Sequence, residues 1–384
     1  MISVPLAARR ALLGAALLAP SMVLAAAPAF VGTEACTRCH EKAAQAWRGS
    51  QHDLAMQAPT PATVLGDFSG ATFRKDGVTT TFARKGERFV IRTEGPDGKP
   101  AEFEVQYTFG VDPLQQYLLA LPGGRLQAFT IAWDSRPKAR GGQRWFHLYP
   151  KEKLRPGDEL HWTGRQNNWN FMCADCHSTN VAKGYDAKAD AYATTWSALN
   201  VGCEACHGPG SAHVAWAKAG TRGDAGKGLT VSLGERKGVS WLPDAATGIA
   251  KRSAPRSTAR EIEVCAQCHA RRAQIAEGYH AGRRFLDHYR PSLLEADLYE
   301  ADGQQRDEVY KWGSFLQSRM HAAGVTCTDC HDPHSGKTPA PASAVCARCH
   351  LPAKFDDPKH HFHQPGTKGA ECTSCHMPAR LYMV

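Results

Sequence analysis

The sequence predicts a mainly α-helical chain with much irregular structure, interrupted by an inserted antiparallel β-rich domain. Three observations support this fold class. A five-residue motif, Cys-x-x-Cys-His, occurs seven times, and helix-forming runs such as residues 41–47 lie beside it. Residues 60–165 lack the motif and alternate in hydrophobicity with the period of two that is typical of strands. Residues 220–258 are rich in Gly, Lys and Ser without periodicity, which predicts a surface loop.

The motif itself indicates covalently bound haem. A zinc site, a redox dithiol or a disulfide framework also uses paired cysteines, but none requires a histidine directly after the second one. Histidine fills only 18 of 384 positions, yet it completes all seven copies, and these copies use all 14 cysteines. In c-type haem attachment the two thiols bond to the haem vinyl groups, and the histidine becomes the proximal iron ligand.

The sequence therefore predicts a multihaem cytochrome c with seven haem c groups. The motifs, each giving two thioether cysteines and one proximal histidine, are Cys36–Cys39–His40, Cys173–Cys176–His177, Cys203–Cys206–His207, Cys265–Cys268–His269, Cys327–Cys330–His331, Cys346–Cys349–His350 and Cys372–Cys375–His376. We refer to them as motifs 1 to 7.

Residues 1–29 have the pattern of a cleaved secretory signal peptide. Arg9 and Arg10 precede a short apolar run, residues 11–18, and small alanines follow. A retained anchor is the weaker interpretation, because the run is shorter than the about 20 apolar residues that span a membrane. We expect a periplasmic or cell-surface protein with no transmembrane segment after cleavage.

Net charge does not indicate a nucleic-acid partner. The formal charge of the chain is +9, but two arginines leave with the signal peptide and each haem brings two propionates. We expect the assembled, oxidised protein to be near neutral, with basic residues such as Arg283 and Arg284 pairing with propionates.

The rest of the chain divides into three predicted segments. Residues 30–59 form the first haem segment, residues 60–165 the β-rich insertion, and residues 166–384 a hexahaem domain. The insertion is interpreted as a lid over the first haem, a docking face or a purely structural element. Its alternating stretches, separated by Gly- and Pro-rich turns, are residues 78–82, 88–92, 102–107 and 126–131.

Residues 143–172 are dense in aromatic side chains. Aromatic rings often pack against haem faces and exclude water, so we expect this stretch to line the pocket of the second haem. His147 and His161 lie within it, and each is interpreted either as an axial ligand or as a buried, hydrogen-bonded histidine.

Eleven histidines lie outside the motifs, which is enough to give every haem a second axial ligand. A haem with two histidine ligands carries electrons, because neither face is open, whereas an open face permits chemistry. Helix-breaking Pro209 and Pro333 turn the chain after motifs 3 and 5. The predicted distal ligands, in order of preference, are His52, His213 and His334, then His361 and His363, then His288, His321 and His161, with His147, His280 and His360 ranked last.

Four segments resemble a known superfamily: residues 47–52, 203–213, 327–334 and 372–378. They are similar to the multihaem cytochromes c that include pentahaem nitrite reductase, octahaem hydroxylamine oxidoreductase and the tetrahaem carrier of nitrifying bacteria. Within it, the chain most resembles, over nearly all of residues 31–384, a branch often fused to tetratricopeptide repeats. This sequence ends at Val384 without repeats, which fits either a natural short form or a truncation.

The resemblance implies closely stacked haem pairs on a mainly helical scaffold, with His52, His213 and His334 as distal ligands. The activities of the superfamily's enzymes do not carry over cleanly to this sequence. Pentahaem nitrite reductase has a Cys-x-x-Cys-Lys active haem, whereas all seven motifs here end in histidine, and the cross-linked tyrosine of hydroxylamine oxidoreductase cannot be identified by motif.

The leading functional hypothesis is a heptahaem electron carrier that passes single electrons along stacked haems between redox partner proteins. The second is an oxidoreductase acting on a small nitrogen or sulfur compound at one five-coordinate haem, for which no catalytic residue is identified. The third is a subunit of a cytochrome filament, in which terminal haems of a homo-oligomer meet between chains.

Overall fold

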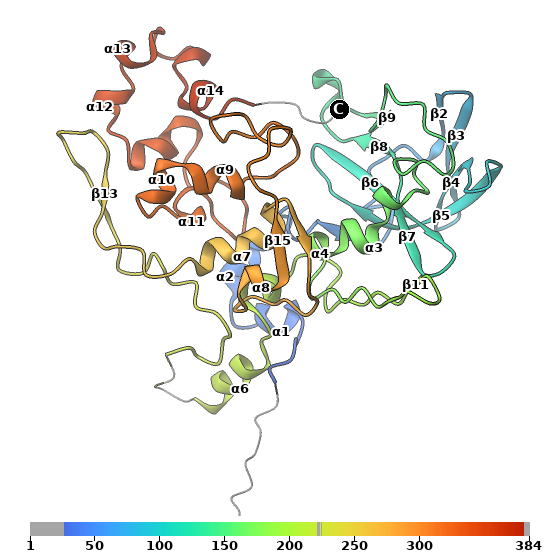
Figure 1. Ribbon diagram of the computed structural model, residues 1–384, viewed down its shortest axis with the longest axis horizontal. Coiled ribbons are helices and arrows are strands. Elements are labelled where there is room, and N and C mark those ends of the chain that lie inside the picture. Colours follow the sequence, from blue (N-terminus) through green and yellow to red (C-terminus); the bar gives the residue numbers. More distant parts are fainter. Residues whose placement is uncertain (1–26, 221–222, 224, 380–384) are drawn as a thin grey trace, which may run out of the picture.

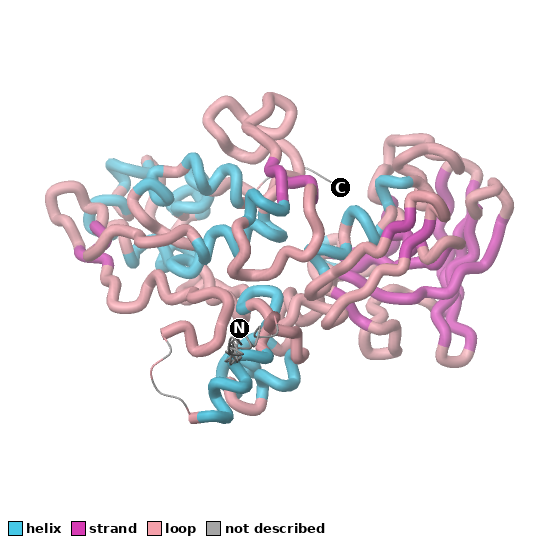
Figure 2. Tube along the Cα trace, turned by 60° about the horizontal axis from the view of Figure 1, so that its bottom comes forward, coloured by secondary structure: helices cyan, strands magenta, loops and turns pink. Residues whose placement is uncertain are grey.

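A computed structural model describes residues 27–220, 223 and 225–379, so most of the predicted signal peptide lies outside the described residues. The chain forms two parts, a strand-rich part and a part built of short helices and loops (Figures 1 and 2). Helices and strands occupy similar numbers of residues. The fold is therefore mixed, and the expected predominance of helix is wrong because the helices around the motifs are short. In the described part of the chain, no helix has the length and apolar character needed to cross a membrane.

The strand-rich part is one antiparallel sheet, in which nine strands of the described chain take part. Its main order is β2-β3-β4-β5-β6-β8-β9, with β1 paired to β5 and β7 paired to β6. This confirms the antiparallel structure that the alternating pattern predicts. The strands are β1 (Met56–Gln57), β2 (Ser69–Lys75), β3 (Val78–Lys85), β4 (Arg88–Glu94), β5 (Pro100–Phe109), β6 (Leu114–Leu121), β7 (Arg125–Ala128), β8 (Ile131–Asp134) and β9 (Arg144–His147).

Turn chemistry and apolar packing fix the register of these strands. Asp76 and Gly77 join β2 to β3 with φ angles of 50° and 87°, the left-handed conformations that a two-residue hairpin turn requires. Phe82 of β3 is paired with Ile91 of β4, and both are fully buried. Trp145 of β9 stacks on Phe82 with ring centroids 3.6 Å apart. The core of the sheet is thus largely aromatic.

A second apolar cluster joins the sheet to motif 2. Phe109 and Leu118 of the sheet pack with the fully buried Trp169 and with Ala174, which lies inside motif 2. The expectation that residues 143–172 line the second haem is therefore only partly met. Trp169 lies beside that motif, whereas Trp145 and Trp162 belong to the core of the sheet.

The other part contains short helices connected by long loops. The first two are α1 (Thr33–Thr37) and α2 (Glu41–Trp47), and α3 (Trp169–Met172) leads from the sheet into motif 2. The remaining helices are α4 (Ala174–His177), α5 (Cys203–His207), α6 (Ser211–Ala219), α7 (Arg260–His269), α8 (Phe285–His288), α9 (Trp312–Gln317), α10 (Arg319–Ala322), α11 (Cys327–Cys330), α12 (Pro352–Phe355), α13 (Pro358–His361) and α14 (Cys372–His376), with a 3-10 helix, η3 (Ala342–Arg348), at motif 6.

Candidate haem sites

Each motif folds as about one helical turn. In motif 1 the backbone N–H of His40 donates to the carbonyl of Cys36 at 3.0 Å, and His350 in motif 6 repeats this bond to Cys346 at 2.9 Å. Residues three and four apart share one face of a helix. Both cysteines and the histidine of a motif therefore face the same side, as attachment to one planar group requires.

The geometry does not support the competing interpretations of the cysteines. All 14 are free thiols, so no disulfide joins them. Within the ranges that the structure describes, no three His, Cys, Asp or Glu side chains gather in the way that a zinc ion requires. A haem iron takes only two ligands from the protein, whereas a structural zinc ion takes four. Histidines that meet in pairs are therefore enough for haem.

Four motif histidines face a second histidine from elsewhere in the chain. The ring centroids lie 6.0–6.4 Å apart in all four pairs, and three of the pairs are stacked in parallel. A metal bound by two imidazole nitrogens at about 2 Å each separates the ring centres by about 6 Å. The pairs are His40–His213, His52–His269, His207–His334 and His360–His376.

Hydrogen bonds orient several of these rings for metal binding. His213 Nδ1 lies 2.7 Å from the carbonyl oxygen of Lys227, and a ring nitrogen of His52 donates to the carbonyl of Pro333. Such a bond holds the proton on one nitrogen and leaves the other free for a metal. Burial lowers the pKa of His52, His207 and His269, so their imidazoles are neutral, as a ligand must be.

For His177, His331 and His350, the described residues provide no facing histidine ring. His177 meets the edge of Phe109 at a centroid distance of 5.4 Å, and its Nδ1 lies 3.2 Å from the carbonyl of Ala55. His350 meets Phe355 at 5.5 Å. These three histidines have the motif geometry without the second ring.

The predicted distal ligands separate into two groups. His52, His213 and His334 each face a motif histidine, as listed above. Of the others, His321 is within 3.0 Å of Arg256, and His288 is buried against Tyr279. His161 lies in the sheet part next to Trp162, while His361 and His363 are on or beside α13, and none of these five contacts a motif histidine ring.

His360 is the site residue that the sequence ranked last but the structure brings to a motif. Its ring lies parallel to that of His376 at 6.1 Å. Asp357 caps α13 by accepting from the N–H of Lys359, with Pro358 in the first turn. This Asp-Pro pair marks the start of a helix, but the pair cannot show which of three nearby histidines faces motif 7.

Contacts between cysteine thiols show which motifs are neighbours. Cysteine side chains of different motifs lie close enough to shift one another's pKa, and these contacts link motif 1 to 3, motif 2 to 4, motif 4 to 5, and motif 6 to 7. The neighbouring pairs are Cys36–Cys203, Cys176–Cys268, Cys265–Cys327 and Cys346–Cys372.

Motif 3 reaches motif 4 through an apolar contact. Cys206 packs in a small cluster with Val264, the residue before Cys265.

Residues at the two x positions of the Cys-x-x-Cys-His motifs form hydrogen bonds that connect neighbouring motifs. Glu204 of motif 3 is buried and accepts backbone N–H groups of Val31 and Gly32, just before motif 1, at 2.9 and 2.8 Å. Glu261 of α7 accepts the backbone N–H of Thr328 in motif 5 at 2.8 Å. Arg348 of motif 6 donates to the carbonyl of Asp329 in motif 5 at 2.8 Å.

Motifs 2 and 4 are joined by a buried ion pair. Arg272 donates to Asp175, a variable position of motif 2, at 2.6 Å, and to the carbonyl of Gln267 in motif 4 at 2.7 and 2.9 Å. Tyr289 donates to the same Asp175 oxygen at 2.8 Å, and its ring lies 4.2 Å from the guanidinium carbon of Arg272. We call these three side chains, Asp175, Arg272 and Tyr289, the Arg272 cluster.

The loop of residues 220–258 contributes to the sites, although its sequence showed no evident chemistry. Arg236 forms a 3.1 Å ion pair with Asp329, and Trp241 donates to the same carboxylate at 3.1 Å. Asp329 is almost fully buried and belongs to motif 5. The loop therefore supports the backbone of that motif.

Comparison with known proteins relates part of the sequence to a family and the fold to a solved structure. Residues 35–65 and 133–208, which include the first three motifs, match the family model described as cytochrome c554 and c-prime. The chain is similar in fold to the crystal structure of the outer cell wall cytochrome OcwA, with a TM-score of 0.52 and 18% identity, over 85% of this chain and 68% of that one. No curated protein matches the chain in sequence.

Proposed function

We propose that this chain, a multihaem c-type cytochrome, carries single electrons along seven haems between redox partner proteins outside the cytoplasm. The observation that carries the proposal is that the seven motifs form one connected series, in which four motif histidines face a second histidine. Each haem, when bound, supplies an iron that takes up and gives off one electron.

Residues outside the motifs would keep substrates away from the bound haem irons. Where two histidines would hold one haem, neither of its faces would be open to a small molecule. His213 and His52 are oriented by carbonyl hydrogen bonds and belong to such pairs. These sites are therefore suited to transfer of electrons and poorly suited to bond chemistry.

The contacts between motifs support one order of transfer. Motif 1 lies beside 3, motif 3 beside 4, and motifs 4, 5, 6 and 7 follow in sequence, with motif 2 beside motif 4. The proposed route runs from motif 1 to motif 7, and motif 2 forms a branch at motif 4. Residues 30–59 carry its start and residues 166–384 the rest, while residues 60–165 form a separate β-rich unit at the branch.

Three measurements on the exported, haem-loaded protein test this proposal. Mass spectrometry of the mature chain is expected to show cleavage within the signal region and seven attached haems. Electron paramagnetic resonance of the oxidised protein is expected to show at least four low-spin irons. Stopped-flow mixing with a small reduced c-type cytochrome is expected to give rapid reduction of all haems. A protein with fewer than four low-spin irons, or haems that are not reduced together, would contradict the proposal.

A second candidate function rests on His177. This histidine is half-buried, and the ring it contacts is the phenylalanine Phe109, whose side chain cannot bind iron. The site would then suit a small nitrogen or sulfur compound. A high-spin ferric signal that shifts on adding nitrite, hydroxylamine or cyanide would support it. A fully low-spin spectrum that is unchanged by all three would exclude it.

A further inference from the structure

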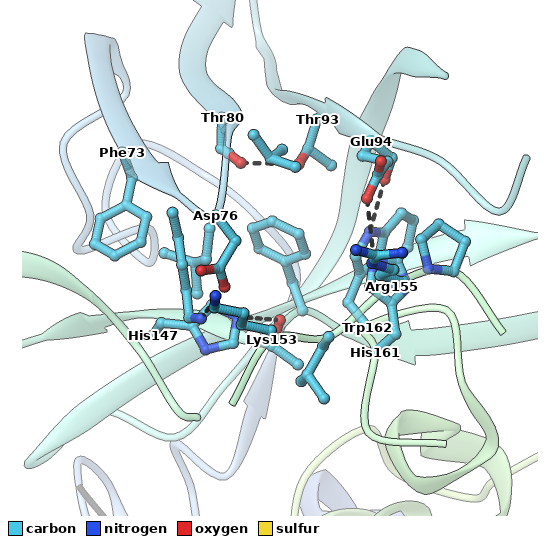
Figure 3. A pocket seen from close by; sticks show the side chains of 17 residues that line it. Phe73, Asp76, Thr80, Thr93, Glu94, His147, Lys153, Arg155, His161 and Trp162 are labelled. Carbon is cyan, nitrogen blue, oxygen red and sulfur yellow. Dashed lines mark hydrogen bonds and ion pairs between the residues drawn. The ribbon is translucent and has the colours of Figure 1, made fainter. Parts of the chain in front are cut away.

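A cavity of about 470 Å³ opens in the sheet part of the molecule. Its walls come from β2, β3, β4, β8 and β9 and from residues 153–162, and none of its lining residues belongs to a Cys-x-x-Cys-His motif (Figure 3). The volume falls in the range of about 300–1,000 Å³ that is usual for small-molecule sites. The haem sites do not account for this cavity.

One wall of the cavity is a rigid aromatic surface. Phe129 and Trp162 are almost fully buried, and their rings meet edge to face with centroids 5.7 Å apart. Trp162 Nε1 donates to the carbonyl of Glu94 at 2.9 Å, which fixes the indole. Phe73 of β2 also lines the cavity. Fixed aromatic rings suit a flat, apolar ligand body.

Two neutral histidines line the cavity. His147 Nδ1 accepts from the backbone N–H of Tyr149 at 2.9 Å, and its Nε2 lies 3.3 Å from the hydroxyl of Thr130. His161 Nδ1 lies 2.8 Å from the hydroxyl of Thr163. Burial lowers the pKa of both rings, that of His147 to about 4, so both are neutral at pH 7.

The charged side chains that line the cavity favour binding of one anion. Lys75 forms an ion pair with Asp76 and also donates to a backbone carbonyl. Among the described residues, neither the ammonium of Lys153 nor the guanidinium of Arg155 has a hydrogen-bond or ion-pair partner. Glu94 is the second carboxylate, and His161 Nε2 is 3.9 Å from it. Three cations against two carboxylates give the cavity one net positive charge.

The two unpaired cations stand on opposite sides of the cavity. In Figure 3, Lys153 lies on the side of Asp76 and His147, and Arg155 lies on the side of Glu94 and His161. Trp162 lies on the side of Arg155 in the same view. A carboxylate bound by Arg155 would place an attached apolar group near Trp162.

We propose that this cavity is a binding site for a small aromatic or aliphatic organic monoanion, whose apolar body packs on Phe129 and Trp162 and whose carboxylate is bound by Lys153 or Arg155. The ligand class follows from the net charge of the cavity and from its aromatic lining. The cavity contains no residue of a haem motif. Ligand binding can therefore be tested separately from electron transfer.

Isothermal titration calorimetry of the haem-loaded protein tests the proposal with defined probes. The probes are benzoate, 2-naphthoate and hexanoate, with 2-naphthylmethanol as the uncharged match of 2-naphthoate. We expect at least one carboxylate to bind with a millimolar or lower Kd, and at least tenfold more tightly than the alcohol. The double variant Lys153→Gln/Arg155→Gln should weaken carboxylate binding by at least tenfold, because charge-assisted hydrogen bonds are lost.

Lys151→Gln is the matched control, because Lys151 is exposed in the same loop but does not line the cavity. It should bind the carboxylate as the unaltered protein does. An unchanged thermal unfolding midpoint of the double variant shows that the loop and sheet remain folded. The proposal is overturned if no carboxylate binds, if the alcohol binds as well as 2-naphthoate, or if the double variant binds like the control.

Discussion

Replacing Arg272 by methionine should destabilise the protein by about 3–5 kcal/mol, the usual cost of leaving one charge of a buried ion pair unpaired. The side chains of Arg272 and Asp175 are only 10% and 13% exposed, and their closest atoms are 2.6 Å apart. In Arg272→Met, the carboxylate of Asp175 keeps the Tyr289 hydroxyl but loses its countercharge. The Gln267 carbonyl also loses its donor.

The double variant Asp175→Leu/Arg272→Met removes both charges. Its expected cost is smaller than that of Arg272→Met alone, because no isolated charge remains and the apolar side chains fill similar volumes. A residual loss of about 1–3 kcal/mol should remain, because the Gln267 carbonyl has no replacement donor and the buried Tyr289 hydroxyl loses its acceptor. The pair of variants thus separates ion pairing from packing.

Urea unfolding of the haem-loaded protein, followed by far-ultraviolet circular dichroism, measures these costs. Arg271→Met is the matched control, because the neighbouring Arg271 pairs with Asp307 at 3.3 Å with both side chains more than 40% exposed. Such surface pairs contribute about 0–1 kcal/mol. If Arg272→Met costs no more than the control, or if the double variant is less stable than Arg272→Met, the Arg272 cluster does not hold motifs 2 and 4 together.

Three further predictions concern single residues. In His360→Ala one low-spin iron should become high-spin by electron paramagnetic resonance, and in the control His363→Ala none should; equal spectra would contradict the pairing with motif 7. In Glu204→Ala the backbone N–H groups of Val31 and Gly32 lose their acceptor, so limited proteolysis before motif 1 should be faster. Equal cleavage rates in the variant and the unaltered protein would argue against this role of Glu204. His147 has a pKa of about 4 when folded and 6.5 when exposed, so unfolding takes up a proton between these values and stability falls as pH drops through them. Calorimetry from pH 7 to 4 should show a smaller fall for His147→Gln, and parallel curves would refute this assignment.

Local patterns in the sequence predicted the sheet well. Alternating residues and glycine-containing turns identified β3, β4 and β5, because register and turn type depend on residues close in the chain. The same reasoning could not show that Trp145 and Trp162 belong to the sheet core, since an aromatic ring serves either a core or a haem pocket.

The histidine pairs depended on contacts that local patterns do not encode. His213 faces motif 1 and His52 faces motif 4, each across more than 170 residues of chain. Turns after motifs 3 and 5 explained why His213 and His334 point away from their own motifs. The turns did not show which other motif each histidine faces. For His360, the choice among three nearby histidines depended on the rotation of a four-residue helix.

The bonds from Glu204 to Val31 and Gly32 join residues that lie more than 170 positions apart. A chain that emerges from a membrane starting at its N-terminus presents motif 1 long before Glu204 arrives. In such a chain, the contact between residues 31–32 and Glu204 forms only after motif 3 has also emerged.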